Sequence, residues 1–77
     1  MEKQKYIRTI DGEIIIFPCT IEHSKFKFLN PISAGFCYIG KKNVECKGFS
    51  FSLKLISNPE EDSLQATKQL FGISLKF

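Results

Sequence analysis

Apolar and polar residues alternate with the period of a β-strand over much of this chain. The alternation is most regular across residues 33–55, where a lysine-containing turn separates two extended arms. A turn of four residues places Ile39 opposite Val44 and Cys37 opposite Cys46. The pattern therefore predicts a hairpin with these four side chains on one face and aromatic and lysine residues on the other.

The alternation changes phase at Gly48. Before it, Val44 and Cys46 are apolar at even positions, and after it the apolar residues of 49–55 stand at odd positions. A strand cannot change its buried face without an extra residue or a bend, so a β-bulge is expected where Gly48 faces Gly35. We expect one strongly coiled strand through residues 49–55 that crosses from one side of the core to the other.

A second hairpin precedes this one. Residues 6–10 and 13–17 flank Asp11-Gly12, a dipeptide typical of two-residue hairpin turns. Such a turn pairs Ile7 with Ile16. The predicted faces carry Ile7, Thr9, Ile14 and Ile16 on one side and Tyr6, Ile15 and Phe17 on the other. Because both faces are apolar, this hairpin is expected to be central.

The segment between the hairpins, residues 19–31, has the least regular pattern. Thr20 is a suitable cap for one helical turn over residues 21–24. The alternation in Lys25-Phe26-Lys27-Phe28 then predicts a short strand. The irregularity marks this segment as a candidate functional loop.

One helix is predicted near the C-terminus. Asn58 is a good N-cap, Pro59 suits the first helical position, Glu61 has capping-box spacing and Gly72 is placed to end the helix. The expected apolar stripe is Leu64, Thr67, Leu70 and Phe71, and the acidic residues at the positive end of the helix dipole are Glu60, Glu61 and Asp62. Residues 73–77 alternate and predict a final strand.

The expected fold is α+β: a single domain, 1–77, with a small antiparallel twisted sheet of 5–6 strands and one C-terminal helix. A small β-barrel of the same strands is the alternative. A chain of 77 residues buries only about 60–65% of its unfolded surface, which leaves a thin margin of stability. Association into a homo-oligomer is therefore expected, because it would bury further apolar surface.

The net charge and the cysteine content indicate which partners and which cellular compartment to expect. The net charge is +3 with the charges interspersed, whereas proteins that bind duplex DNA usually have a denser basic face. Three cysteines and no leader-like start favour a cytoplasmic protein with reduced thiols. The longest apolar run, residues 14–17, is far too short to span a bilayer, so no membrane association is expected.

The reactive side chains predict neither a metal site nor an enzyme. Cys19, His23, Cys37 and Cys46 could supply four zinc ligands, but their spacing lacks the Cys-x-x-Cys pair of structural zinc sites. Cys19 and His23 are the only local nucleophile and base pair. There is no nucleophile elbow and no glycine-rich phosphate loop, so no cofactor is expected. Whether these four residues do more than pack stays open.

Lysines interleaved with aromatics are the remaining candidate site. Aromatic faces with nearby cations suit stacked bases and phosphates. The candidate ligand- or partner-binding residues are Lys25, Lys27, Phe36, Tyr38, Lys41, Lys42 and Lys47. The competing interpretation is structural: Phe26 and Phe28 point inward while the lysines keep a sheet edge soluble.

Two clusters of residues support a broader comparison. They are Asp11-Gly12-Glu13, Ile16-Phe17-Pro18 and His23, and then Ser33-Ala34-Gly35-Phe36, Cys46-x-Gly48-x-Ser50-x-Ser52-Leu53 and Ser57-x-Pro59-Glu60-Glu61-Asp62. In these clusters the chain resembles small, largely uncharacterised proteins of phages and mobile elements. The resemblance implies a stoichiometric binder, an anti-defence inhibitor that binds a host defence protein or sequesters its nucleotide signal. The alternative is a nucleic-acid-binding module that uses aromatic and lysine side chains on a sheet surface.

Overall fold

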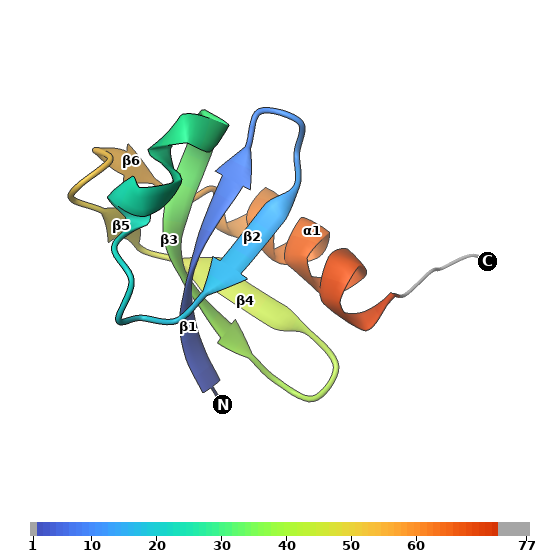
Figure 1. The fold of residues 1–77 in the computed structure, drawn as a ribbon. Helices are drawn as coiled ribbons and strands as arrows, with labels where there is room; N and C mark the ends of the chain where they lie inside the picture. The colour runs from blue at the N-terminus through green and yellow to red at the C-terminus, as the bar shows by residue number, and fades with distance from the viewer. Residues whose placement is uncertain (1, 73–77) are drawn as a thin grey trace.

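The fold combines antiparallel strands with one α-helix, as a computed structural model shows for residues 2–72 (Figure 1). In chain order the elements are β1 (Glu2–Thr9), β2 (Ile14–Phe17), the 3-10 helix η1 (His23–Leu29), β3 (Pro31–Ile39), β4 (Val44–Lys47), β5 (Phe49–Ser50), β6 (Leu55–Ile56) and α1 (Pro59–Phe71). One sheet has the order β2-β1-β3-β4, and β5 and β6 pair separately. The predicted α+β class is confirmed, with six strands in two sheets; the strand expected at residues 73–77 lies outside the described residues.

The β1–β2 hairpin forms, but the predicted register is wrong by one residue. Tyr6 pairs with Ile16, because the loop holds three residues rather than two. The Gly12 N–H donates to the Thr9 carbonyl at 2.9 Å, and the Thr9 N–H donates to the Glu13 carbonyl at 2.9 Å. Gly12 has φ +90°, the left-handed conformation of the third loop residue in such turns.

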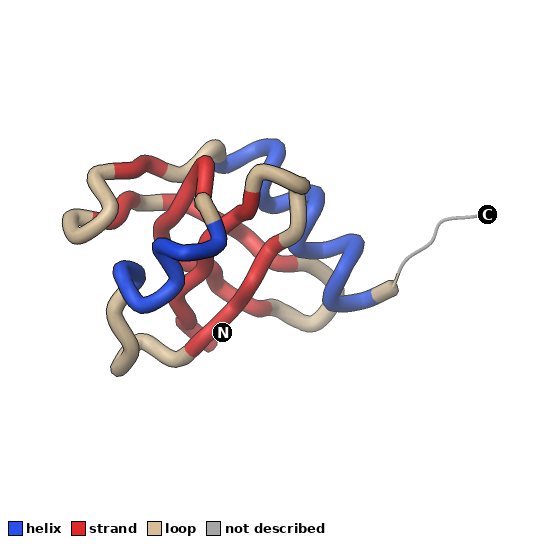
Figure 2. The backbone as a smooth tube through the Cα atoms, turned by 45° about the horizontal axis from the view of Figure 1, so that its top comes forward, coloured by secondary structure: helices blue, strands red, loops and turns tan. Residues whose placement is uncertain are grey.

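This one-residue shift moves the β1 side chains to the opposite face relative to those of β2, since successive side chains of a strand point to opposite sides. Tyr6 therefore joins the face with Ile14, and Ile7 joins the opposite face with Phe17. The buried core under α1 consists of Tyr6, Ile14, Cys37, Val44, Cys46 and Ala66, and the core on the other face of Ile7, Phe17 and Ala34. Figures 1 and 2 show α1 on one side of the sheet and η1 with the β5–β6 hairpin on the other.

The β3–β4 hairpin has the predicted register. Ile39 pairs with Val44 and Cys37 with Cys46. All four side chains lie in or against the core under α1, as expected. Gly48 follows β4 with φ +95° and marks the predicted bend.

The single coiled strand expected over residues 49–55 is wrong. The chain makes a hairpin there, in which Phe49 pairs with Ile56. Ser50 is buried and its hydroxyl accepts a hydrogen bond from the Leu53 N–H at 3.3 Å, which favours a turn over an extended strand. Leu53 and Leu55 pack on the core opposite α1, so the chain does cross from one face to the other.

The segment between the hairpins also differs from its prediction. Residues 23–29 form η1, so the strand expected at residues 25–28 is wrong. Phe26 packs on Phe17 with ring centroids 4.4 Å apart. Asn30 ends η1 with φ +54°. Phe26 thus points inward from a helix, whereas the alternation predicted that it would do so from a strand.

The bounds predicted for the helix are confirmed: α1 begins at Pro59, after the N-cap Asn58, and Gly72 follows it with φ +60°. The capping interaction differs from the expected one. The Asn58 N–H donates to Asp62 Oδ2 at 3.0 Å, while Glu61 accepts from the side chain of Asn58, at 3.1 Å, and not from its backbone. Asp62 therefore takes the backbone-capping role predicted for Glu61.

The apolar stripe predicted for the helix does not face the core. Leu64 is 69% exposed and Leu70 47%. Polar side chains of α1 instead bond to the edge strands of the sheet. The bonds run from Cys46 N–H to Ser63 Oγ (2.7 Å), Val44 N–H to Thr67 Oγ1 (2.9 Å) and Ile14 N–H to Gln69 Oε1 (2.7 Å). Within residues 2–72, α1 thus bridges β2 and β4, the two strands that would pair in a closed barrel.

Asp62 anchors the start of α1 on the sheet. Its side chain is fully buried and accepts hydrogen bonds from the Tyr6 hydroxyl, from Ser33 Oγ at 2.8 Å and from the Asn58 N–H at 3.0 Å. Arg8 Nη1 forms an ion pair with it at 3.1 Å. Burial, together with the hydrogen bond to Asp62, raises the pKa of Tyr6.

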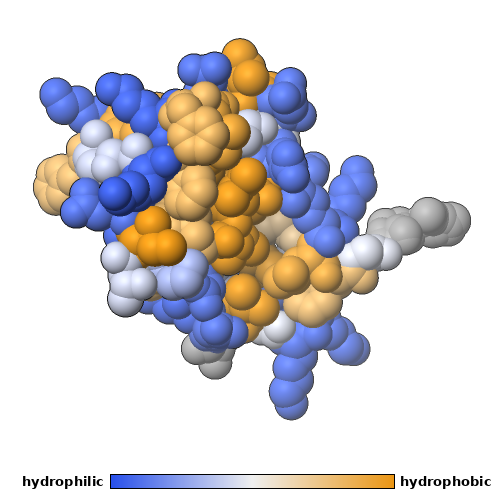
Figure 3. Space-filling view, in the orientation of Figure 1, coloured by the Kyte–Doolittle hydropathy of each residue, from blue (hydrophilic) through white to orange (hydrophobic). Residues whose placement is uncertain are grey.

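The surface has a hydrophobic band over β2 and the C-terminal part of α1 (Figure 3). A groove of about 190 Å³ lies here, lined by Ile14, Ile16, Ala66, Gln69 and Leu70. Among residues 2–72, no helix has the length and apolar character needed to cross a bilayer.

Candidate lysine–aromatic binding face

Lysine and aromatic side chains form two rows on the sheet face opposite α1. Residues that pair directly across antiparallel strands point to the same face. The first row is Lys5, Phe36 and Lys47, and the second is Lys3, Tyr38 and Glu45. We call these six residues the lysine–aromatic face. Each aromatic ring lies on the inner strand β3, with a lysine on at least one neighbouring strand.

Two of these lysines rest on the aromatic rings. The Lys3 Nζ lies 4.6 Å from the centroid of the Phe36 ring, and the Lys47 Nζ lies 4.9 Å from that of Tyr38. Both contacts are diagonal, between neighbouring rows. At these distances the ammonium groups are attracted to the negative faces of the rings. The face therefore presents flat π-surfaces together with positive charge.

A hollow of about 420 Å³ adjoins this face at Phe36. It is lined by Lys5, Glu22, His23, Phe36, Phe49, Ser50, Phe51 and Ser52. The Lys5 Nζ donates to the Ile21 carbonyl at 2.9 Å, which holds this side chain beside the loop before η1. Phe49 and Phe51 are 50% and 85% exposed and make an edge-on pair with centroids 5.2 Å apart. The hairpin thus adds two accessible rings to the site.

His23 supports the site from below. Its ring is 4% exposed and lies edge-on to Phe17 and Phe36, with centroids 5.5 and 5.9 Å away. Its Nε2 is 2.9 Å from the Gly35 carbonyl oxygen, and because a carbonyl only accepts, this nitrogen carries the proton. Burial lowers the pKa of His23 below its ordinary value of 6.5. The imidazole is therefore a neutral, packed group that positions Phe36.

We expect the free energy of unfolding to decrease as the pH falls below about 6.5. In the unfolded chain His23 takes up a proton near this pH, whereas the buried ring resists protonation until lower pH. The contribution of neutral His23 to the free energy of unfolding is therefore complete above pH 6.5. It is lost as the pH falls towards the pKa of His23 in the folded protein. Urea unfolding at about pH 5 to 8 measures it in the wild type and in His23→Gln, which keeps a donor for Gly35. Identical pH profiles would contradict this assignment.

Within residues 2–72, none of the cysteines makes a hydrogen bond to His23. Cys19 is exposed and its thiol donates to the Lys3 carbonyl at 3.6 Å. Cys37 and Cys46 are buried free thiols, and burial raises their pKa values to about 11 and about 12. Thiols with such pKa values are weak nucleophiles at neutral pH. Across residues 2–72, no three His, Cys, Asp or Glu side chains are grouped so that they could hold a metal ion.

Three of the seven predicted site residues come together on the lysine–aromatic face: Phe36, Tyr38 and Lys47. The other four lie apart from it, with Lys25 and Lys27 exposed on η1 and Lys41 and Lys42 exposed in the β3–β4 turn. Sequence reasoning missed Lys3 and Lys5, because β1 was expected to begin at Tyr6. Their spacing of two residues was the available signal, since it places both on one face.

The chain matches no protein-family model, no curated protein and no solved structure. The lysine–aromatic face is therefore the feature of this protein that indicates a function. Such an arrangement suits flat, negatively charged ligands, because rings provide stacking surface and ammonium groups provide charge.

Proposed function

We propose that this protein is a non-enzymatic binder of nucleotide-type ligands. The base stacks on the lysine–aromatic face, and the phosphate lies between lysine ammonium groups. The observation that carries the proposal is the pairing of each ring with a cation: Lys3 with Phe36 at 4.6 Å and Lys47 with Tyr38 at 4.9 Å. Both components needed for a base and its phosphate are therefore present within two adjacent rows of one sheet.

Because lysine side chains are flexible, a ligand base can replace them on the aromatic rings. A lysine that rests on a ring can turn towards a phosphate while a base takes its place on the ring. The hollow beside Phe36, about 420 Å³, is within the size range of small-ligand sites. Glu22 lines the same hollow and can accept hydrogen bonds from amino or hydroxyl groups. This chemistry suits a free nucleotide or one within a single strand.

We also propose a biological setting for this binding, based on the resemblance to phage and mobile-element proteins that the two residue clusters imply. In that setting the protein acts as an anti-defence inhibitor that sequesters a nucleotide signal of the host, or blocks the host protein that uses it. A free nucleotide is the ligand in this form of the proposal. Binding to a single-stranded nucleic acid is the second candidate, because Phe36 and Tyr38 stand at alternate positions of one strand and could stack neighbouring bases.

Binding of labelled single-stranded DNA and RNA, with mononucleotides and cyclic dinucleotides as competitors, tests the proposal. We expect Tyr38→Ala to weaken binding by about 5- to 100-fold, the range for the loss of one stacked base. Lys47→Ala should weaken binding and lower the salt dependence of the affinity by about one phosphate contact. Competition by free nucleotides identifies the signal-binding form, and binding of strands alone identifies the nucleic-acid form.

Two control variants use the same residue types away from the face. Phe28→Ala removes an exposed ring on η1, and Lys42→Ala removes a charge in the β3–β4 turn. Both should bind like the wild type. The proposal fails if no nucleotide-type ligand binds at low salt, or if the controls lose as much affinity as Tyr38→Ala and Lys47→Ala. Far-ultraviolet circular dichroism verifies that each variant is folded.

A further inference from the structure

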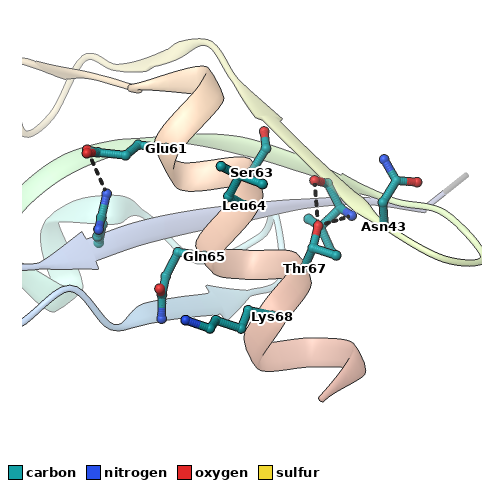
Figure 4. Close-up of a pocket in the computed structure, with 9 residues that line it drawn as sticks. Asn43, Glu61, Ser63, Leu64, Gln65, Thr67 and Lys68 are labelled. Atoms are coloured by element: carbon teal, nitrogen blue, oxygen red, sulfur yellow. Dashed lines mark hydrogen bonds and ion pairs between the residues drawn. The ribbon is translucent and has the colours of Figure 1, made fainter. Parts of the chain in front are cut away.

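The outer face of α1 carries exposed apolar side chains. Leu64 is 69% exposed and points away from the sheet, on the opposite side of the helix from the buried Asp62 and Ala66. Phe71 is seven residues further on, which places it on the same line along the helix after two turns. A hollow of about 630 Å³ surrounds Leu64, and Figure 4 shows the side chains that line it. An apolar stripe is thus left uncovered because polar residues attach the helix to the sheet.

Charges frame this stripe asymmetrically. Glu61 lies about one turn before Leu64 and Lys68 about one turn after it, both on the same side of Leu64 and both lining the hollow. They too are seven residues apart. Among the described residues the Lys68 side chain has no hydrogen-bond or ion-pair partner, whereas Glu61 accepts from Arg8 at 3.1 Å. The face therefore has a negative end, an apolar centre and a positive end.

We propose that α1 docks against α1 of a second copy of this chain in an antiparallel pair. A two-fold axis near Leu64 brings Glu61 of each copy to Lys68 of the other, so the surface is complementary to itself. The two Leu64 side chains then pack between two ion pairs, and each Phe71 lies beyond one of these pairs. An antiparallel pair also sets the negative end of each helix dipole beside the positive end of the other, which is favourable.

The alternative orientation is unfavourable. A parallel pair would place Glu60 and Glu61 of the two copies against each other at one end and leave Lys68 beside Lys68 at the other. The charge pattern therefore selects both the partner and the direction of the helices. A single helix pair buries less surface than a standard interface, so the dimer is expected to dissociate on dilution into the micromolar range, about 1–100 µM.

Sedimentation equilibrium of the full chain over a range of concentrations tests the pairing. We expect Leu64→Glu to raise the dissociation constant at least about tenfold, because it places a charge in the apolar centre. Lys68→Glu should raise it about fivefold, since each dimer loses two ion pairs and gains like-charge contacts. The double variant Glu61→Lys with Lys68→Glu restores the opposite charges in reversed order and should return to within about threefold of the wild type.

Lys25→Glu provides the control, because it makes the same charge change at an exposed position of η1, on the opposite side of the sheet from α1. It should associate like the wild type. A protein that stays monomeric at every concentration overturns the proposal, as does a dimer that Leu64→Glu leaves intact. A double charge variant that associates no better than Lys68→Glu excludes the antiparallel arrangement. Thermal unfolding of each variant separates loss of the dimer from loss of the fold.

Discussion

The variant Asp62→Ala is expected to lose about 3–5 kcal/mol of the free energy of unfolding. This carboxylate is fully buried and accepts hydrogen bonds from the Tyr6 hydroxyl, Ser33 and the Asn58 N–H, beside the ion pair with Arg8. Its removal leaves the buried hydroxyls of Tyr6 and Ser33 without this acceptor, at the cost of their desolvation energy, and leaves Arg8 paired with the exposed Glu61 alone. A domain of this size has only about 4–12 kcal/mol in all.

Urea unfolding monitored by circular dichroism measures this loss. Asp11→Ala is the matched control, because Asp11 is exposed in the β1–β2 loop. The control should unfold at nearly the wild-type urea concentration, while Asp62→Ala should be partly unfolded without urea. A decrease of less than about 1 kcal/mol would mean that water replaces the missing carboxylate and that the network does not anchor α1.

Gly35→Ala is expected to cost about 3 kcal/mol, through a backbone clash. A Cβ at residue 35 would lie 2.6 Å from the carbonyl oxygen of Lys47 and 3.2 Å from the carbonyl carbon of Gly48. The β3 and β4 backbones would have to separate, at a point where the Gly35 carbonyl also holds His23. The same change should therefore disturb the lysine–aromatic face.

Gly72→Ala separates this clash from the ordinary effect of replacing glycine. Among residues 2–72, and apart from its chain neighbours and the nearby helix backbone, no heavy atom lies within 4 Å of a Cβ built at Gly72, but its φ is +60°. Only the left-handed backbone then opposes the substitution, at about 1 kcal/mol. The chemical denaturation midpoints should rank wild type, Gly72→Ala and Gly35→Ala in decreasing order. If Gly35→Ala is as stable as Gly72→Ala, the close approach of the two strands is not rigid.

Local chemistry predicted the elements whose ends are set by their own residues. The bounds of α1 follow from Asn58, Pro59 and Gly72, and the β3–β4 register follows from a turn of four residues. The β1–β2 register failed because Asp11-Gly12 suits both a two-residue turn and a three-residue loop. The sequence did not distinguish these alternatives, and one residue of difference moved the β1 side chains to the other face relative to those of β2.

The orientation of α1 depends on contacts that are distant in sequence. Helix-start electrostatics accounts for Glu60 and Glu61, which stay exposed, but Asp62 is buried against Tyr6 from the first strand. This buried contact turns Leu64 outward. A hydrophobic stripe predicts the buried face of a helix only when no polar network competes for it, and a network between residues 6 and 62 leaves no periodic signal.

The candidate site was partly accessible to sequence reasoning. The alternation of β3 put Phe36 and Tyr38 on one face together with Lys47. The contribution of β1 required knowledge of sheet order, since Lys3 and Lys5 reach these rings only because β1 pairs with β3 along its whole length. The sequence pattern did not predict the hairpin with Phe49 and Phe51, because its alternation of apolar and polar residues resembles that of a single strand.

The hydrogen bonds from α1 to the sheet edges also protect the protein against aggregation. An exposed edge such as the isoleucine-rich β2 is a template on which further strands add and grow into fibrils. Many proteins protect such edges with lysine or proline. Here the side chain of Gln69 hydrogen-bonds to the backbone of Ile14, and those of Ser63 and Thr67 hydrogen-bond to the backbone of β4. Detachment of the helix would therefore convert a protected globule into an aggregation-prone sheet.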